Sequence, residues 1–516
     1  MKKNFIKTEQ GQSYKQVLTE LLTQITPVDF RERVGLNEDR KVTLKKFVVI
    51  TVDEIIKTAE NNDWGLCAKN GCIYVFNGKY WQLVNADDFK SFLGNAAIKM
   101  GVPEFDAKYH QFRDELYKQF ISVSNLPIPE PSKAVLINLL NGTFEITSEE
   151  QKLREFRHED FIKYQLPFEY DSEARCPMFI KYLLKVLPDT DCRKVLAEYL
   201  GYIFVTDLKL EKVLILYGSG ANGKSVLFEI VNAILGNENI CSYSLQELTK
   251  EVSYQRSELS DKLVNYTTEI SRHMNTDNFK KLASNEPVGA RPIYGKPFTM
   301  RDYSCKLIFN CNELPKDVEP NEAFFRRFIV MPFEQTIQEN EQDPNLAKKI
   351  IASELSGVFN WILEGLCRLL AQKKFTDSAK IQEQLQTYRI ESDSVALFIE
   401  GNGYKPSPSC SALLQDVYWK YCRFCNNNGY RPCSNRSMAE RLRNMKYELT
   451  KTRKGVIVYV DGFRQESYIE KVEEEMDYQE KMEILREIRV IEDAEKKEAM
   501  QATKAMQIIK KYILQS

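Results

Sequence analysis

The spacing of apolar and polar residues changes along this chain and divides it into regions. In the first of them, residues 72–81 indicate two short strands around an Asn-Gly pair, which suits the positive φ angles of a tight hairpin turn. The spacing is helical in Met178–Leu184 and in Val195–Leu200, and a turn separates these two runs. The pattern therefore predicts a small N-terminal α+β region and a mainly helical segment over 160–204.

Four short apolar runs rich in β-branched and aromatic residues follow. Helical or loop sequence separates each run from the next, as in proteins with a buried, mainly parallel sheet. We therefore expect the fold class in the middle of the chain to be α/β. The runs are Val213–Tyr217, Leu263–Thr267, Lys306–Phe309 and Phe328–Phe333.

The last part of the chain returns to helical spacing. Residues 347–389 are helical in pattern, and in 392–464 helices precede two strand-like runs, Tyr447–Thr450 and Val456–Val460, around a basic turn. Helices followed by a terminal hairpin predict a winged helix. Residues 466–516 hold no Gly or Pro and are rich in Glu, Lys, Met and Ile, which favours a long helix or a helical pair. That segment is either an interaction arm or a frayed tail.

Length and composition restrict the class of protein. With 516 residues the chain exceeds what one hydrophobic core usually serves, and 43% hydrophobic with 28% charged residues is typical of globular proteins. No apolar run approaches the ~18 residues of a membrane span, and polar sequence follows the first residues, so we expect no membrane segment and no secretory signal. Twelve scattered cysteines suit a reducing compartment, and the predicted location is the cytoplasm.

The formal net charge of −1 conceals a local basic region. Residues 404–465 contain twelve Lys and Arg against four Asp and Glu. Because phosphates attract clustered cations whatever the base sequence, this segment predicts a contact with nucleic acid. A solvated basic surface is the alternative interpretation.

One motif indicates the chemistry of the middle region. Gly218 to Ser225 match the pattern GxxxxGKS, between the strand that ends at Tyr217 and an amphipathic helix over 226–235. The glycines let the backbone curl around a triphosphate, so that N–H groups and the helix N-terminus point at anionic oxygens. We expect Lys224 to reach the β and γ phosphates of ATP, and Ser225 to reach the Mg²⁺. The candidate nucleotide-binding residues are Gly218, Ser219, Gly220, Ala221, Asn222, Gly223, Lys224 and Ser225.

Polar residues at the ends of the next strands complete the predicted ATPase site. Glu269 follows the second strand and is the candidate catalytic base and metal ligand, with a surface carboxylate as the alternative. Asn312 follows the third strand and is expected to orient the attacking water; we prefer it to Asn310 because it lies nearer the strand exit. Arg326 and Arg327 precede the fourth strand. Arg327 is the candidate arginine finger for a neighbouring subunit's nucleotide, and an ordinary salt bridge is the alternative.

The order of these motifs resembles the core of the superfamily III helicases, in particular the phage and plasmid primase-helicase family with its poxvirus members. The resemblance covers about residues 160–333 and rests on GxxxNGKS, the strand ending in Glu269, residues 290–298, Asn312-Glu313-Leu314-Pro315 and Arg326-Arg327-Phe328. It implies an AAA+ ATPase core that assembles as a hexamer around DNA and translocates on one strand. It also implies that Arg291–Met300 forms a hairpin in the central channel, where Arg291 and Lys296 contact DNA. An exposed turn lysine is the alternative reading of Lys296.

Two features depart from the family pattern. Many such ATPases carry a second acidic residue before the catalytic glutamate, where this chain has Thr268, so metal coordination rests more on Ser225 and water. Family members often have an N-terminal primase domain, but residues 1–150 show no paired catalytic carboxylates with a nearby histidine. We therefore expect a primase activity to come from a separate partner.

A cluster of four cysteines near the C-terminal end includes a CxxC pair, which raises the question of zinc. Cys422 and Cys425 share one face of a predicted helix over 413–425, and the spacings to Cys410 and Cys433 fit no common zinc module. We therefore expect buried structural thiols.

These features predict an α/β protein with an AAA+ core that acts as an ATP- and Mg²⁺-dependent helicase in the replication of a phage, plasmid or other mobile element. It would work as a homo-oligomeric ring, a hexamer, on single-stranded and forked DNA. The predicted regions are an N-terminal α+β domain (1–150), a helical collar (151–205), the ATPase core (206–345), a helical segment (346–391), a winged helix (392–465) and a helical tail (466–516).

Two other functions remain open at this point. One is an AAA+ remodeller or regulatory switch that acts on a protein partner, and the other is an initiator that melts an origin without processive unwinding. A remodeller needs neither Lys296 nor the basic segment 404–465, so these two features distinguish it from a helicase.

Overall fold

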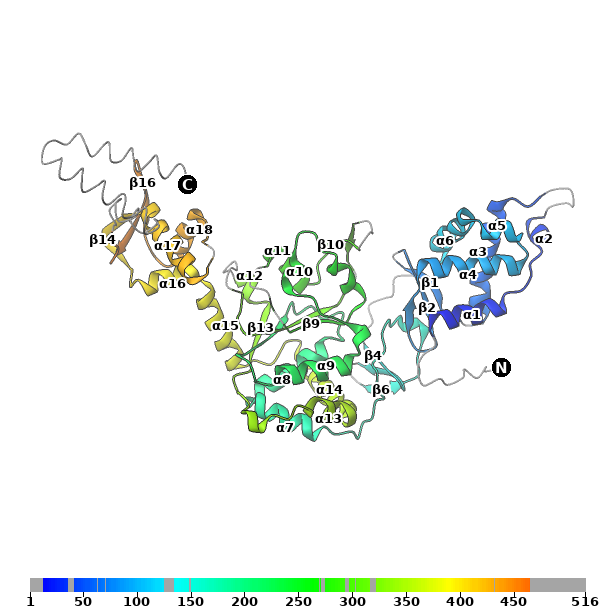
Figure 1. Cartoon of the computed structure of the whole chain (residues 1–516), viewed down its shortest axis with the longest axis horizontal. Helices are drawn as coiled ribbons and strands as arrows, with labels where there is room; N and C mark the ends of the chain where they lie inside the picture. Colours follow the sequence, from blue (N-terminus) through cyan, green and yellow to red (C-terminus); the bar gives the residue numbers. More distant parts are fainter. Residues whose placement is uncertain are drawn as a thin grey trace, which may run out of the picture. The chain divides into compact units, whose positions relative to one another are not determined.

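The chain divides into two compact units, which are described separately. The computed structural model describes residues 13–35, 41–62, 64–69, 71–124, 134–147, 150–268, 270, 274–292, 297–301, 303–315, 322–430 and 432–464. The first unit spans Met1–Ser392 and the second Asp393–Ser516 (Figure 1). The predicted helical tail over 466–516 lies outside the described residues.

The first unit begins with helices packed on a small antiparallel sheet. Phe89, Phe112 and Phe120 are fully buried between the helices, because each of them lies on the apolar face of its own helix. The predicted hairpin is confirmed, with Gly78 at a φ of 86° in its turn. The elements are α1 (Tyr14–Gln24), α2 (Phe30–Val34), α3 (Leu44–Asn61), β1 (Leu66–Lys69), β2 (Cys72–Phe76), β3 (Trp81–Leu83), α4 (Ala86–Met100), α5 (Glu104–Lys108) and α6 (His110–Val123).

The region predicted as a helical collar (151–205) begins with a strand that the pattern did not indicate. A second antiparallel sheet joins β4 (Val135–Leu139), β5 (Gly142–Ile146) and β6 (Gln151–Arg154). β6 is a strand because it pairs with β5 along its length, a long-range choice that local spacing cannot reveal. The two predicted helices are present as α7 (Pro177–Val186) and α8 (Thr190–Tyr202), after the short 3-10 turn η1 (His158–Asp160).

The centre of the first unit is a parallel five-stranded sheet among the described residues, in the order β13-β7-β12-β9-β8. All four predicted runs are strands of this sheet, and β8 is an additional two-residue strand. The elements are β7 (Val213–Tyr217), α9 (Lys224–Leu235), η2 (Asn237–Asn239), β8 (Ile240–Cys241), α10 (Leu245–Thr249), η3 (Gln255–Asp261), β9 (Val264–Thr267), α11 (Thr276–Ala283), β10 (Val288–Ala290), β11 (Phe298–Met300), β12 (Lys306–Cys311), α12 (Glu322–Phe325) and β13 (Phe328–Pro332).

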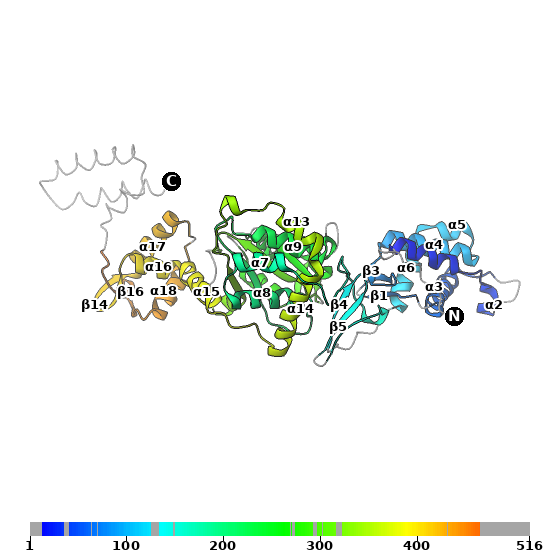
Figure 2. The same ribbon diagram turned by 90° about the horizontal axis from the view of Figure 1, so that it is seen from below.

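Both faces of this sheet are covered by helices, which explains why its strands are apolar throughout (Figures 1 and 2). Leu214 and Leu216 of β7 point into a core shared with α7, α8, α9 and α14. Val213 and Ile215, the alternate residues, point into a second core with α10 and α11. The remaining elements of the unit are η4 (Glu339–Glu341), α13 (Leu346–Ser353), α14 (Leu355–Gln372) and α15 (Ala379–Ser392).

Helices α8 and α14 pack closely because small residues face each other. A Cβ atom on Gly365 would lie 2.4 Å from the backbone carbon of Ala197, so only glycine fits at this crossing. Among the described residues no single helix has the length and apolarity of a membrane span, although the pair Glu339–Ser353 and Leu355–Gln372, bent by 81°, passes that test jointly.

The second unit packs helices against a three-stranded antiparallel sheet, in the order β14-β16-β15. The predicted terminal hairpin is confirmed as β15 and β16. β14 escaped the sequence pattern because it is mostly exposed and its pairing with β16 is irregular between Pro406 and Ser411. The elements are α16 (Ser394–Gly401), β14 (Lys405–Leu413), α17 (Leu414–Asn428), α18 (Asn435–Asn444), β15 (Leu449–Thr452) and β16 (Gly455–Asp461).

Candidate nucleotide-binding site

The residues of the GxxxxGKS pattern, called here the motif loop (Gly218–Ser225), form the turn between β7 and α9. They leave the carboxyl edge of the parallel sheet, where open α/β sheets bind their ligands. Gly220, Ala221 and Gly223 have φ angles of 118°, 48° and 84°, left-handed conformations of the kind that build backbone concavities for anions. The motif loop therefore has the position and the backbone shape that a phosphate site requires.

The motif loop is fixed by its surroundings on three sides. The Gly218 N–H donates to the carbonyl oxygen of the last residue of β12 at 3.0 Å. The Asn222 amide donates to the Phe333 carbonyl oxygen, just beyond β13, at 2.8 Å. On the third side the Tyr182 hydroxyl of α7 donates to the Gly223 carbonyl oxygen at 2.8 Å. The loop conformation is thus set by the sheet and by α7.

Lys224 lies folded into the motif loop. It is 7% exposed, and its ammonium donates to the Gly218 carbonyl oxygen at 2.6 Å and to Asn222 Oδ1 at 3.0 Å. Burial lowers its pKa. The neighbouring Cys311 thiol is neutral near pH 7 because burial raises its pKa to about 12. The Gly218 carbonyl oxygen and Asn222 Oδ1 are both uncharged acceptors, so an anionic phosphate would be a stronger partner for the Lys224 ammonium.

The N-terminus of α9, a helix described in full, is suited to an anion. Gly223 is its N-cap without a side-chain capping bond, and its first turn contains no acidic residue. The first N–H groups of a helix have no intrahelical acceptor, and the helix dipole favours negative charge there. Ser225 is exposed in this turn, where its hydroxyl can meet a metal ion. These residues fit a magnesium-bound triphosphate.

Gly218 allows a close contact that alanine would not. A Cβ at this position would lie 2.1 Å from Asn222 Nδ2 and 2.4 Å from the Phe333 oxygen, the two atoms whose bond anchors the motif loop. We expect Gly218→Ala to weaken nucleotide binding about tenfold or more, since overpacking costs about 1–3 kcal/mol. Titration with a fluorescent ATP analogue measures this. Gly401→Ala is the control because nothing lies within 4 Å of its added Cβ. Equal affinity of the two variants would contradict the prediction.

Asn312 lies beside the motif loop, at the same edge of the sheet. It follows β12, whose last residue pairs with Tyr217 of β7, and its side chain is exposed. Asn310 is buried within β12, and its Oδ1 accepts a hydrogen bond from the Tyr266 hydroxyl at 3.2 Å. This placement agrees with the choice of Asn312 over Asn310, although its catalytic role stays a prediction.

Glu269 lies outside the described residues, so its predicted roles as base and metal ligand stay predictions. Its strand, β9, ends at Thr267, which pairs with Phe309 of β12. β12, which comes later in the chain, therefore lies between β9 and β7.

The arginine pair lies at the opposite edge of the sheet. The Val213 N–H, at the start of β7, donates to the Arg327 carbonyl oxygen at 2.7 Å, and β7 runs parallel to β13. Arg326 and Arg327 are therefore separated from their own motif loop by the length of β7, roughly 16 Å at about 3.3 Å per residue. In this arrangement neither arginine lies beside the motif loop of its own chain.

The two arginines differ in exposure, which bears on the choice of Arg327 made from sequence; the finger role itself stays a prediction. Arg327, the residue expected to be the finger, is 6% exposed. Its guanidinium donates to Ser284 Oγ at 3.0 and 3.3 Å and to the Ala323 carbonyl oxygen, and it lies 3.3 Å from a Glu211 carboxylate oxygen. The Arg326 side chain is 55% exposed and pairs with the same Glu211 oxygen at 2.9 Å. Arg327 cannot extend into solvent without breaking these contacts. Arg326 is therefore the arginine of the pair that is exposed at the surface.

The segment 291–300, expected to form a DNA hairpin, contains one strand of an antiparallel pair, β11, and the other strand, β10, comes just before it. β10 and β11 pair antiparallel, with Ala290 opposite Phe298. Arg291 is exposed directly after β10. Lys296 lies outside the described residues, so its contact with DNA, like that of Arg291, stays a prediction.

Among the described residues of the second unit, exposed cations occur on and just after α18 and on and around the turn between β15 and β16. The buried face of α18 is apolar, with Met438, Ala439 and Leu442. Arg441 is partly buried and pairs with Asp393 at 3.3 Å. Exposed positive charge is thus present at α18 and at the β15–β16 hairpin. The exposed residues concerned are Arg436, Arg443, Lys446, Lys451, Arg453 and Lys454.

The four cysteines of this unit are not equivalent. Cys425 is buried in α17, as expected for a structural thiol. Cys410 is exposed on β14, which corrects the expectation for that residue, because the strand itself was not foreseen.

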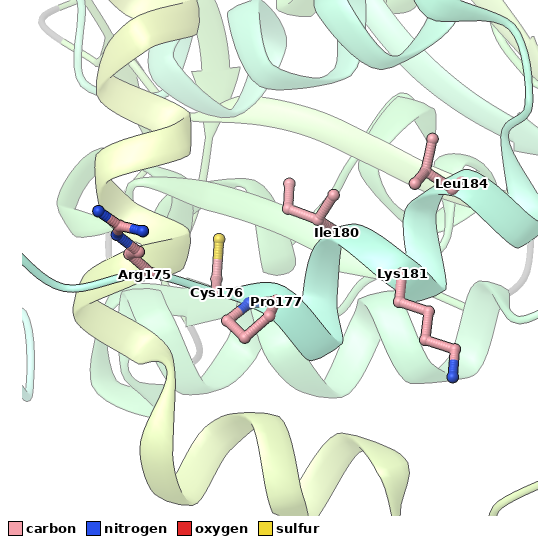
Figure 3. A pocket seen from close by; sticks show the side chains of 6 residues that line it. All are labelled: Arg175, Cys176, Pro177, Ile180, Lys181 and Leu184. Carbon is pink, nitrogen blue, oxygen red and sulfur yellow. The ribbon is translucent and has the colours of Figure 1, made fainter.

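A shallow apolar hollow lies on α7, the helix that also holds the motif loop. Its volume is about 610 Å³, and Ile180 and Leu184 contribute apolar side chains to it (Figure 3). The lining residues are Arg175, Cys176, Pro177, Ile180, Lys181 and Leu184. None of them belongs to the motif loop, and Tyr182, which bonds to that loop, is not among them.

Comparisons with known proteins agree with these motifs. Residues 53–188 match a family described as D5 N terminal like, and residues 216–327 match a family of unknown function, DUF5906. The chain is 27% identical over 209 residues to "Putative helicase L207/L206" of Acanthamoeba polyphaga mimivirus, and 22% identical over 370 residues to "Putative helicase 121R" of Invertebrate iridescent virus 3. These matches support a relationship to the phage and viral primase-helicase family.

The extent of these alignments is limited. They cover 38% and 63% of this chain, and the chain spans only 22% and 39% of the length of these two relatives of the family. Among solved structures, the apo A form of the NrS-1 C terminal region matches 78% of this chain and 97% of its own, with a TM-score of 0.44 at 13% identity.

Several residues that shape the site were missed from sequence. Tyr182 was assigned only to a helix, and Glu211 and Ser284 were not considered, although both hold the arginine pair. Their residue types are common on surfaces, and their partners are far away in sequence. The one local signal is that Glu211 lies two residues before an apolar strand.

Proposed function

We propose that this protein is an ATP-driven DNA helicase that acts in the replication of a phage, virus or other mobile element. The observation that carries the proposal is the distribution of charged groups on the parallel sheet. The motif loop is at the carboxyl edge and the arginine pair at the amino edge, as an ATPase that completes its sites between subunits requires. The relatives named as helicases support the same class.

In the proposed site, ATP binds with Mg²⁺ at the motif loop. Lys224 turns from its neutral acceptors to the β and γ phosphates, while the N–H groups of the motif loop and of α9 bind phosphate oxygens. Ser225, and Glu269 beyond the described residues, hold the metal ion, which neutralises charge on the phosphates. Asn312 positions the attacking water, and Glu269 accepts its proton.

The proposal includes a ring of identical subunits, a hexamer. Because the exposed arginine lies about a strand length from its own motif loop, it can serve only the site of a neighbouring subunit. Hydrolysis then depends on assembly.

DNA contacts are proposed for two surfaces. The hairpin of β10 and β11, with Arg291 and Lys296, follows a single strand in the ring channel. The second unit, with α17 and α18 as a helix pair and β15 and β16 as a terminal hairpin, fits a winged helix, whose cations on α18 and on the strand turn would meet duplex phosphates at a fork. A separate primase partner and a cytoplasmic location belong to the same proposal.

ATP hydrolysis with and without single-stranded DNA tests this function. We expect DNA to raise the turnover of the wild type severalfold, and Lys296→Ala to keep the basal rate while losing the stimulation. Lys349→Ala is the control and should be stimulated like the wild type. Lys349 is an exposed lysine of α13 that pairs with Asp343.

The opposite result would point to another class of protein. If hydrolysis by the wild type ignores DNA at low salt, where phosphate contacts are strongest, the helicase proposal fails. A protein substrate for an AAA+ remodeller would then be the next hypothesis to test.

A further inference from the structure

We propose that Arg327 is a positioning residue that ties the base of the β10–β11 hairpin to Arg326, and that Arg326 is the arginine that reaches the neighbouring subunit's nucleotide. This inference rests on the proposed function and assigns different roles to two adjacent guanidinium groups. It would couple movements of the β10–β11 hairpin, which contacts DNA in the proposed function, to the ATP site of the neighbouring subunit.

The first step is the set of contacts made by Arg327. Its guanidinium bridges three separate segments: Ser284 at the C-cap of α11, Ala323 in α12, and Glu211 before β7. Ser284 is itself 4% exposed, so the bridge is inside the protein. A buried guanidinium with three partners defines one geometry, because a change at any partner leaves a buried donor unsatisfied.

The second step is that α11 and the arginine segment form one packed body. Phe279 of α11 stacks on Phe328, next to Arg327 in sequence, at 4.8 Å and an interplanar angle of 10°. The same ring contacts Phe324 of α12 at 5.3 Å. Phe279 is fully buried, so a displacement of α11 is transmitted to the arginines through packed side chains.

The third step connects α11 to both strands of the hairpin. β10 begins at Val288, and before it the Glu286 N–H donates to the Lys281 carbonyl oxygen of α11 at 2.9 Å. Beyond β11, the Tyr303 hydroxyl lies 3.2 Å from the Lys281 oxygen and 3.0 Å from the Glu286 oxygen, and Tyr303 is 7% exposed. The entry and the exit of the hairpin are therefore both fixed to the helix whose end holds Arg327.

The last step is the carboxylate that the arginines share. One oxygen of Glu211 lies 3.3 Å from Arg327 and 2.9 Å from Arg326. A shift of Arg327 changes the position of this oxygen, and the exposed Arg326 follows it. A pull on the hairpin by DNA thus changes how Arg326 is presented to the next subunit.

Ser284→Ala tests the tie, because it removes the acceptor at the hairpin side and leaves both arginines in place. We expect the basal hydrolysis rate to stay within about twofold of wild type, and stimulation by single-stranded DNA to fall about 3- to 10-fold, the range for networks of this kind. Ser284→Thr keeps the hydroxyl and should restore stimulation. Ser353→Ala, an exposed serine on α13 that bonds only within its helix, should behave as wild type.

Arg327→Lys supplies a second test if Ser284→Ala is too unstable, which thermal unfolding reports. A lysine keeps the charge but cannot bridge Ser284 and Glu211, so stimulation should fall to a similar extent. Normal stimulation of Ser284→Ala would overturn the tie. Loss of hydrolysis in Arg327→Lys as complete as in Arg326→Ala would instead make Arg327 the finger and overturn the assignment. If the wild type itself is not stimulated, the proposed function fails, which is a different outcome.

Discussion

Lys224→Ala is expected to lower the rate of ATP hydrolysis about 10²- to 10³-fold, the loss typical of removing one charge-stabilising donor from an active site. The side chain is buried in the motif loop and bonded only to neutral oxygens of Gly218 and Asn222, so its charge is placed for an incoming phosphate. Truncation removes that charge and empties the centre of the loop. Steady-state phosphate release at saturating ATP and Mg²⁺ measures the effect.

The control for this variant is Lys185→Ala on α7. Lys185 forms an exposed ion pair with Glu341 at 2.7 Å, a kind of contact that contributes little to stability, so both the hydrolysis rate and the unfolding temperature should stay near wild type. Wild-type turnover by Lys224→Ala would remove the motif loop from the catalytic site. A parallel loss of folded protein would show instead that the lysine is needed for the loop itself.

Arg326→Ala is expected to abolish hydrolysis alone and to regain part of it when mixed with Lys224→Ala. Loss of an arginine finger costs about 10³- to 10⁵-fold in turnover. A subunit with Arg326→Ala still has an intact motif loop, and a subunit with Lys224→Ala still has an intact arginine. Where the two adjoin in the right order, one complete site forms between them.

Phosphate release from a titration of one variant into the other, at constant total protein, measures this rescue. Recovery that peaks at intermediate ratios is the expected result, because only mixed rings contain complete sites. Arg33→Ala, which removes an exposed guanidinium of α2 paired with Glu54 of α3, is the control and should hydrolyse ATP without a partner. Absence of rescue, with assembly of mixed rings verified, would mean that Arg326 acts within its own chain or not at all.

The chemistry of the site was readable from sequence wherever it depends on neighbours in the chain. A phosphate loop needs its glycines, lysine and serine in one continuous segment, so Gly218–Ser225 carries its own identification. The four apolar runs predicted strands of the parallel sheet because burial on both faces makes such strands apolar at every position. The preference for Asn312 over Asn310 also came from local position, one residue beyond the strand against one within it.

Only the tertiary structure decided the features that depend on distant partners. β6 and β14 are strands because other strands pair with them, and β12 lies between β7 and β9 although it follows both in the chain. Two adjacent arginines look alike in sequence, yet one is buried and the other exposed, because Ser284 and Ala323 bond to Arg327 whereas both arginines share Glu211. The sequence by itself determined which chemical groups are present at the strand ends; long-range packing decided which of them lie beside the motif loop, at the surface or in the interior.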